Sequence, residues 1–306
     1  MAEPTYPMVS VVIPTLDRPG LLERAVQHVF DQDYPGPLEC VVVFDHVPVR
    51  ALDIPSRPGR VLTGIANTHR KGLPGGRNSG VEASTGTVLA FCDDDDLWRP
   101  DKLRRQVDVL QREPDAGAVA CGVRLQGPGI DRERTLDQEW VTLDDLLADR
   151  LMEVNSSTIV VWRSSMDSAG PVDEDIPGGY AEDYEWLLRL AAYRPIAIIR
   201  EPLSVIEWHG GSFFFGHWLT IAEAMRYVLA KHPEFARSRR GRARIHGQIG
   251  FAFAAAGRRR AAWSELATVA RLDLREKRLY AALPVVLGLV SGDRVLRAAQ
   301  RRGRGV

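Results

Sequence analysis

Short, mostly apolar runs alternate with amphipathic segments along the first part of the chain. The runs at residues 9–13, 40–44 and 88–91 predict buried strands, and residues 61–62 predict a weaker one. Apolar residues at helical spacing follow these strands at residues 21–30, near Val81, and from about Pro100 onward. Because strands buried on both faces need helices to cover them, this alternation predicts an α/β fold with a Rossmann-like, mostly parallel sheet.

A mixed pattern follows over the middle of the chain. Strands are predicted at residues 118–123, 158–162 and 196–199, with a helix over Glu182–Tyr193 between the last two. We therefore expect two halves of one α/β domain, residues 1–115 and 116–215, before a third region at residues 216–306.

This third region, residues 216–306, is predicted to be helical, and it is basic. One of its apolar stripes consists of Trp263, Leu266 and Ala270. Residues 1–230 carry 22 Lys and Arg against 35 Asp and Glu, a net charge of −13, whereas residues 231–306 carry 18 against 5, a net charge of +13. This asymmetry predicts an acidic catalytic or binding body joined to a segment that meets something anionic.

The cysteines and the apolar stretches bear on where in the cell the protein is expected. Cys40, Cys92 and Cys121 lie in apolar runs without a C-x-x-C pair, which predicts buried thiols and argues against a disulfide framework or a zinc site. The longest uncharged apolar stretch, residues 279–290, contains Pro284 and is shorter than the ~20 residues of a membrane-spanning helix. We expect a cytoplasmic protein, either free or peripheral at the inner face of the plasma membrane.

Residues 93–96 are consecutive aspartates that directly follow the predicted strand at residues 88–91. Adjacent carboxylates repel one another, so such a cluster is stable where solvent or a cation neutralises it. The strand period of two predicts Asp93 and Asp95 on one side, where they can bind one Mg²⁺ or Mn²⁺ that bridges a diphosphate. The alternative is an acidic cap on the helix that follows.

Two further segments carry candidate chemistry. Residues 182–185 place carboxylates in the first turn of a helix behind a glycine-rich turn, which suits a general base, although acidic first turns also occur as ordinary caps. Residues 72–80 are rich in glycine and contain Arg77, a combination that suits a phosphate, with a plain turn as the alternative. The spacing of these glycines excludes the P-loop and the dinucleotide-binding motif.

Five motifs follow one another in the order VSVVIPTLDRP, VVVFD, GRNSG, VLAFCDDDDLWRPDKL and AEDYEWLLRL. Over residues 8–212 this order and spacing resembles the family 2 glycosyltransferases of the GT-A fold. The resemblance implies inverting transfer of a sugar from a nucleotide-diphosphate donor, a UDP-sugar by default, with Mn²⁺ or Mg²⁺. It also implies that residues 1–115 bind the nucleotide sugar and that residues 116–215 bind the acceptor.

The resemblance assigns donor-binding roles to several residues by position. Pro14, Thr15 and Asp17 match the contacts to nucleobase and ribose, and Asp45 matches the aspartate that binds the base. Arg77 matches the arginine of the R-N pair, near the base or the diphosphate. The family commonly reads D-D-G-S where this chain has Phe44-Asp45-His46-Val47, so base recognition is where the chain departs from the family.

The metal and the general base are assigned in the same way. Asp93 and Asp95 match the D-x-D positions, with Asp95 as the direct metal ligand and Asp93 also on the donor. Asp183 matches the catalytic base of the E-D pair. His209, in a W-H-G-G-S segment, matches a histidine that approaches the metal or the diphosphate, with a surface role as the alternative.

The leading hypothesis is therefore an inverting glycosyltransferase for cell-wall, polysaccharide or related synthesis. The resemblance implies a polysaccharide, a glycolipid or a natural-product precursor as the acceptor. We expect a single displacement, because a retaining mechanism would need a separate carboxylate nucleophile and the sequence offers no separate candidate for it. The alternatives are a metal-dependent nucleotidyltransferase and a non-catalytic protein that binds sugar nucleotides. The basic region is expected either to meet an anionic membrane or to pack on the acidic body, and sparse aromatics argue against nucleic acid.

Overall fold

The computed structural model describes residues 5–207 and 216–300, which divide into two compact units. The first unit comprises residues 5–143, 151–174 and 182–207, and the second comprises residues 144–150, 175–181 and 216–300. Over these described ranges, every helix is too short or too polar to span a bilayer.

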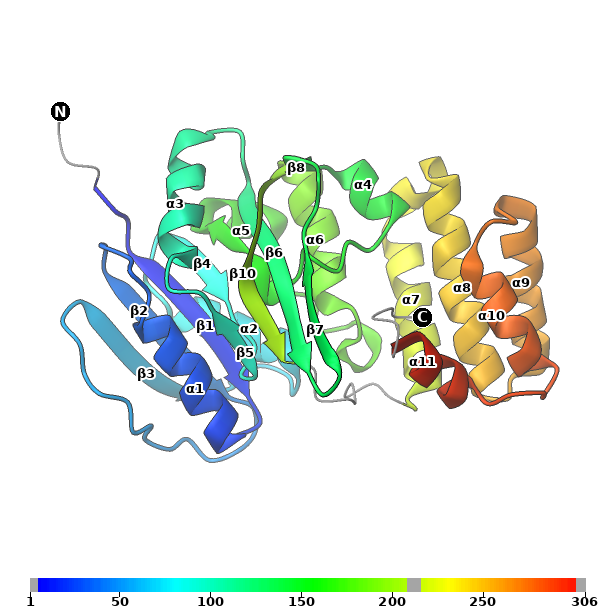
Figure 1. Ribbon diagram of the computed structural model, residues 1–306, viewed down its shortest axis with the longest axis horizontal. Coiled ribbons are helices and arrows are strands. Elements are labelled where there is room, and N and C mark those ends of the chain that lie inside the picture. The colour runs from blue at the N-terminus through cyan, green and yellow to red at the C-terminus, as the bar shows by residue number, and fades with distance from the viewer. Residues whose placement is uncertain (1–4, 208–215, 301–306) are drawn as a thin grey trace. The chain divides into compact units, whose positions relative to one another are not determined.

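A mixed sheet is the scaffold of the first unit (Figure 1). Its strands are β1 (Val9–Thr15), β2 (Leu38–Phe44), β3 (Arg60–Ala66), β4 (Val88–Phe91), β5 (Asp96–Trp98), β6 (Ala118–Gly127), β7 (Ile130–Arg134), β8 (Trp140–Val141), β9 (Val160–Trp162) and β10 (Ile196–Glu207). The order is β3-β2-β1-β4-β9-β6-β10-β5, with β7 on β6 and β8 on β10. The pairs β3–β2, β2–β1, β1–β4 and β6–β10 are parallel, and β9 is antiparallel to both its neighbours.

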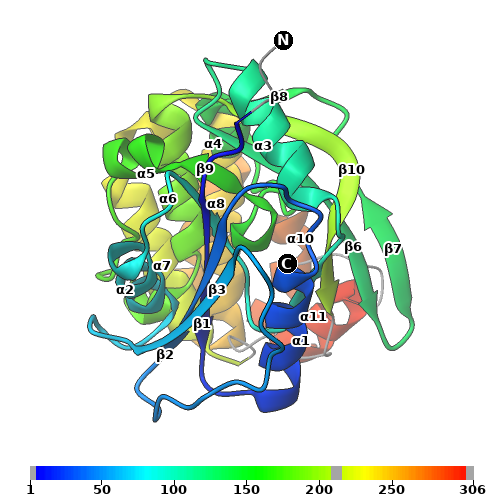
Figure 2. The ribbon, with the colours of Figure 1, turned by 90° about the vertical axis from the view of Figure 1, so that its left-hand side faces the viewer.

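Helices cover both faces of this sheet. They are α1 (Pro19–Phe30), α2 (Leu73–Ala83), α3 (Lys102–Arg112), α5 (Arg163–Ala169) and α6 (Glu182–Tyr193), with the short 3-10 turn η1 (Ser156–Thr158). Alternate β1 residues point to opposite faces, and Val9, Val11 and Ile13 pack in one core with the apolar stripes of α1 and α3. Helix α2 packs on the other face, so α1 and α2 flank the strands from opposite sides (Figure 2).

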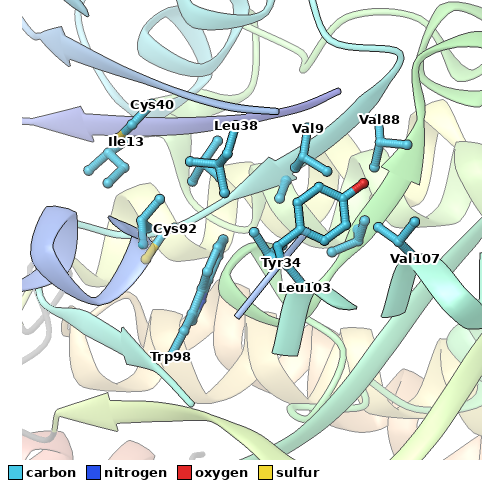
Figure 3. Close-up of a cluster of buried hydrophobic side chains, with 14 of the residues drawn as sticks. Val9, Ile13, Tyr34, Leu38, Cys40, Val88, Cys92, Trp98, Leu103 and Val107 are labelled. Carbon is cyan, nitrogen blue, oxygen red and sulfur yellow. The ribbon is translucent and has the colours of Figure 1, made fainter. Parts of the chain in front are cut away.

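Burial of apolar side chains in the core between the sheet, α1 and α3 stabilises these elements. Valine-rich β1 and β2 are buried along their whole length, as expected for parallel strands with both faces covered. Figure 3 shows Val9 and Leu38 from the sheet packed near Trp98 and Leu103. Each such aliphatic side chain contributes about 1.5–3 kcal/mol when it is fully buried.

The α/β class and the mostly parallel sheet are confirmed, but the prediction for the glycine-rich segment is wrong. The glycine-rich segment is not a turn before a short helix near Val81, because α2 already begins at Leu73. Two of its glycines, Gly76 and Gly80, are required by close packing on the sheet. A Cβ atom at Gly80 would lie 2.2 Å from Cγ1 of Val12, and one at Gly76 would lie 2.9 Å from Cβ of Pro14.

The second unit is helical apart from its turns. It contains most of α4 (Leu143–Ala148), the 3-10 turns η2 (Pro177–Gly179) and η3 (Pro233–Arg237), and the helices α7 (Trp218–Lys231), α8 (Arg239–Ala255), α9 (Arg259–Leu272), α10 (Lys277–Val286) and α11 (Gly292–Gln300). Helix α8 is its centre and packs on α7, α9 and α10 (Figure 1). The predicted stripe on α9 is partly wrong, since Leu266 is buried but Trp263 is 45% exposed.

Candidate active site

The candidate site lies in the first unit, where β1, β2 and β4 end. These strands are parallel, with Thr15 opposite Phe44 and Val12 opposite Phe91. Their carboxyl ends therefore meet at one edge of the sheet, which is where open α/β sheets bind ligands. Thr15 ends β1, Asp45 follows β2, and the aspartates 93–96 follow β4.

The aspartate run is a turn between two strands and not a helix cap. The backbone N–H of Asp96 donates to the carbonyl oxygen of Asp93 (3.0 Å), and β5 begins at Asp96, whereas α3 begins only at Lys102. The Asp93 carboxylate pairs with Arg77, and the Asp95 carboxylate pairs with Arg18.

Arg77 is the buried centre of the site. Its side chain is 3% exposed, and its Nη2 donates to Oδ1 of Asp93 (2.8 Å) and to Oγ of Ser156 (3.0 Å). Its Nη1 pairs with the carboxylate of Glu182. Helix α2, the turn after β4 and the first turn of α6 are thus joined through one guanidinium, whose planar fork suits several carboxylates at once.

The charges of this cluster shift one another's protonation. Burial alone would lower the pKa of Arg77, but the carboxylates of Asp93 and Glu182 outweigh it and raise that pKa. Desolvation raises the pKa of Asp93, Arg77 opposes this, and the nearby charges of Asp95 and Asp183 raise it further. Asp95 and Asp183 thus each act on the charge of Asp93, so added positive charge would stabilise the cluster.

Asp183 lies beside this cluster, in the first turn of α6. It is partly exposed, and it borders the same small cavity of about 10 Å³ as Arg77 and Ser156. Its neighbour Glu182 is buried and pairs with Arg77, so the two acids of the pair differ in environment. A partly exposed carboxylate at a helix start can accept a proton from a bound hydroxyl.

The residues that the resemblance places on the nucleoside surround the end of β1. Thr15 donates its hydroxyl to Oδ2 of Asp94 (2.6 Å) and accepts from the backbone N–H of Asp17 (2.9 Å). Asp17 has a φ of 61°, a left-handed conformation that few residues other than glycine adopt, and its Oδ1 accepts from Nε of Arg50 (2.7 Å). Pro14 lies against α2 at Gly76.

Asp45 is buried and holds the segment that leads into α2. Its Oδ1 accepts from Nδ2 of Asn67 (2.7 Å), and its Oδ2 accepts from the backbone N–H of Gly72 (2.9 Å). Asn67 in turn accepts from Oγ of Ser79 (2.7 Å). Asp45 therefore has a structural partner on each oxygen, and its remaining lone pairs are the ones available to a ligand.

A divalent cation fits the donor chemistry of Asp93 and Asp95. Their side chains are 33% and 22% exposed, and both are hard oxygen ligands of the kind that Mg²⁺ and Mn²⁺ prefer. In the described part of the chain, no group of three His, Cys, Asp or Glu side chains could hold a metal ion. Mg²⁺ sites commonly use one or two carboxylates and take their other ligands from phosphates and water.

Sequence reasoning missed several members of this site. Arg18 and Ser156 received no role, and Glu182 was included only among the carboxylates of residues 182–185, although each directly contacts a predicted site residue. Opposite charges were the only signal, and sequence alone does not pair an arginine with an acid 105 positions away. His209 lies outside the described residues.

Comparison with known proteins identifies the family of the chain. Residues 10–163 match the model of the family described as glycosyl transferase family 2. An uncharacterized glycosyltransferase of Haemophilus influenzae is 25% identical over 213 residues, which cover 66% of this chain and 69% of that protein. A Campylobacter jejuni protein named GalNAc(5)-diNAcBac-PP-undecaprenol β-1,3-glucosyltransferase is 29% identical, but the match covers only 44% of this chain and 42% of that protein.

Solved structures show the same fold. The Staphylococcus aureus protein TarS in complex with UDP-GlcNAc has a TM-score of 0.61 at 14% identity, with 97% of this chain and 92% of that chain covered. A mannosyltransferase from Pyrobaculum calidifontis in complex with GDP-Man and Mn²⁺ has a TM-score of 0.58 at 20% identity, with coverage of 97% and 87%. The GT-A type predicted for the sheet is thus confirmed. The family match extends over half of the sequence, and the chain belongs to glycosyl transferase family 2.

Proposed function

We propose that the chain transfers a sugar from a nucleotide-diphosphate donor to a hydroxyl of a saccharide or lipid-linked acceptor, by a single inverting displacement. The observation that carries this proposal is the junction at Arg77. One buried guanidinium contacts Asp93 of the D-x-D pair and Glu182 beside Asp183. Displacement needs a site for the leaving group next to a proton acceptor. The junction connects Asp93, assigned to the leaving-group site, with the helix start that carries Asp183, assigned as the proton acceptor.

The proposed mechanism assigns each residue one task. Asp183 accepts the proton of the acceptor hydroxyl as the oxygen attacks the anomeric carbon. Asp93 and Asp95 would hold a divalent cation, which would supply positive charge against the negative charge that grows on the departing diphosphate. Arg77 keeps Asp93 and the start of α6 in fixed positions, so the leaving group and the base keep their spacing.

The donor nucleoside is proposed to lie at the ends of β1 and β2. Pro14, Thr15, Asp17 and Asp45 line this edge of the sheet. A UDP-sugar remains the default donor. TarS in complex with UDP-GlcNAc and the mannosyltransferase with GDP-Man support a nucleoside diphosphate sugar as the donor class, with either base.

Turnover of nucleotide sugars with and without Mn²⁺ tests this function. We expect one UDP- or GDP-sugar to raise the melting temperature and to release its nucleoside diphosphate in the presence of an acceptor saccharide. At 100 times its Kd a donor stabilises the folded state by about 2.7 kcal/mol, which is readily measured. Release of pyrophosphate from a nucleoside triphosphate, with no diphosphate from any nucleotide sugar, would support the nucleotidyltransferase alternative instead.

We also propose that the second unit meets an anionic membrane surface through the turn between α10 and α11. Leu287 and Leu289 are 57% and 76% exposed there, and a Cβ atom at Gly288 would lie 2.8 Å from Nη2 of Arg259. Among the described residues, Arg258 to Arg260 pair with no acid. Exposed apolar side chains beside unpaired arginines are typical of surfaces that bind anionic lipid.

Other arginines of this unit already have partners, which supports the packing alternative for them. Arg237 pairs with Asp144 (2.9 Å) and Arg240 with Asp149 (3.2 Å). Sedimentation with phosphatidylglycerol vesicles at low salt distinguishes the arginines that pair with acids from those proposed to meet the membrane. We expect Leu289→Ser to weaken co-sedimentation and Arg237→Gln to leave it unchanged. Equal binding of Leu289→Ser and the unchanged protein, or no binding by either, would contradict the membrane proposal.

A further inference from the structure

Arg18 contacts two of the consecutive aspartates at once. It lies between β1 and α1, and its Nη1 donates to Oδ2 of Asp95 (2.8 Å). Its Nη2 pairs with Oδ1 of Asp94, and its Nε lies 3.3 Å from Oδ2 of the same residue. All three guanidinium nitrogens are therefore committed to the turn that carries the proposed cation ligands.

The two aspartates hold Arg18 in different ways. Asp94 is an anchor, because its side chain is only 4% exposed and it also accepts the hydroxyl hydrogen bond of Thr15 (2.6 Å). Asp95 is 22% exposed, and its contact with Arg18 is a single hydrogen-bonded pair. The contact with Asp95 is thus the one that can be given up while Arg18 stays at the site, held by Asp94.

We propose that Arg18 is a positioning residue that occupies Asp95 before the donor arrives and so makes cation binding depend on the nucleotide. The inference rests on the proposed function, in which Asp95 ligates the cation. A guanidinium and a divalent cation compete for the same carboxylate oxygen and repel each other at close range. The donor diphosphate carries negative charge that can neutralise both, so cation and nucleotide bind more favourably together than separately.

Mn²⁺ binding, followed by the electron paramagnetic resonance signal of the free ion, tests this without any turnover. The full chain is titrated with Mn²⁺ alone and again with saturating UDP. We expect Arg18→Gln to bind Mn²⁺ alone about 2- to 5-fold more tightly, because a partly exposed ion pair no longer competes for Asp95. With UDP present the difference should shrink, so the ratio of the two Mn²⁺ affinities falls.

Arg24→Gln is the matched control. Arg24 lies on α1, one to two turns beyond Arg18, and it pairs with Glu207 instead of the aspartates (Nη1 to Oε2, 3.3 Å). We expect its Mn²⁺ affinities to equal those of the unchanged protein. Arg18→Lys keeps the charge but loses the fork, and we expect values between those of the unchanged protein and Arg18→Gln.

Equal or weaker binding of Mn²⁺ alone by Arg18→Gln, in a variant with an unchanged melting temperature, would overturn the role of Arg18. The proposed function would then still stand, because the unchanged protein would bind Mn²⁺ with UDP. No Mn²⁺ binding by the unchanged protein, with UDP or without it, would overturn both the cation site and this inference.

Discussion

Arg77 and Glu182 form a buried ion pair between residues 105 positions apart, with side chains 3% and 6% exposed. The pair connects α2, whose glycines let it lie close to β1, with the helix whose first turn carries Asp183. A buried charge is unfavourable unless it is paired, so Arg77 and Glu182 each stabilise the other in its buried position.

Removing one partner of this pair should destabilise the protein strongly. We expect Arg77→Met to lower the free energy of unfolding by about 3–5 kcal/mol, because it leaves Glu182 and Asp93 without their cation in a poorly solvated place. Chemical denaturation of Arg77→Met, Glu182→Gln and the double variant measures these free energies of unfolding. The double variant should lose less stability than the sum of the losses in the two single variants.

The exposed pair of Arg124 and Asp131 is the matched control, with side chains 44% and 55% exposed. The same cycle of substitutions there should give a coupling of about 0–1 kcal/mol, as is usual for surface pairs. A coupling between Arg77 and Glu182 no larger than this control value would mean that the junction does not hold the site together.

Replacement of the proposed base should separate catalysis from donor binding. We expect Asp183→Asn to lower kcat by about 10²- to 10⁴-fold, because an amide cannot accept the acceptor proton. The Kd of the nucleotide sugar, measured by titration calorimetry, should change little, because Asp183 is assigned to the acceptor side. Asp131→Asn on β7 serves as the control, and full turnover by Asp183→Asn would remove this residue from the mechanism.

Lys102 should make the stability of the first unit depend on pH. It is fully buried, its Nζ lies 3.8 Å from the ring centroid of Trp98, and among the described residues this atom has no hydrogen-bond partner. Burial lowers the pKa of Lys102 to about 8, from 10.5 for the free group. Between these values the unfolded chain binds a proton that the folded chain does not, so stability rises with pH through this window.

Below pH 8 the folded protein carries the full cost of the buried charge. We therefore expect Lys102→Met to raise the free energy of unfolding at pH 7 by about 3 kcal/mol, at about 1.36 kcal/mol for each unit of pKa shift. The gain should shrink as the pH rises from 8 toward 10.5. Urea denaturation of both proteins at pH 7 and at pH 9.5 measures it, and a gain independent of pH would argue for a packing effect alone.

Glycines in two helices should respond in opposite ways to alanine. A Cβ atom at Gly80 would lie 2.2 Å from Val12, whereas one at Gly20 in α1 would have nothing within 4 Å. We expect Gly80→Ala to lower the free energy of unfolding by about 1–3 kcal/mol through overpacking. Gly20→Ala should raise it by up to about 1 kcal/mol through helix propensity. Thermal unfolding of both variants checks the contrast, and equal effects would contradict the close packing of α2 on β1.

Several elements could be predicted because their signal is local. Strands β1 and β4 are buried on both faces, so β4 is a continuous run of apolar residues and β1 is mostly apolar. Helix α6 has its bounds at Glu182–Tyr193, where its apolar periodicity and its acidic first turn predict them. The glycines of α2 led to the wrong prediction of a turn. Glycine occurs both in turns and where a helix closely approaches a sheet, and only the packing distinguishes the two.

The residue types and their order along the chain thus determined the α/β class, the strand ends at which the candidate site forms, and the carboxylates to which we assign its chemistry. Tertiary structure decided the partners. Asp93 faces Arg77 and Asp95 faces Arg18 because the aspartates form a turn, and Glu182 reaches Arg77 because α6 packs near β4 through Trp186 and Phe91. The physical reason is that burial on both faces and helical periodicity leave a pattern in neighbouring residues, whereas an ion pair depends on where two distant segments of the chain meet.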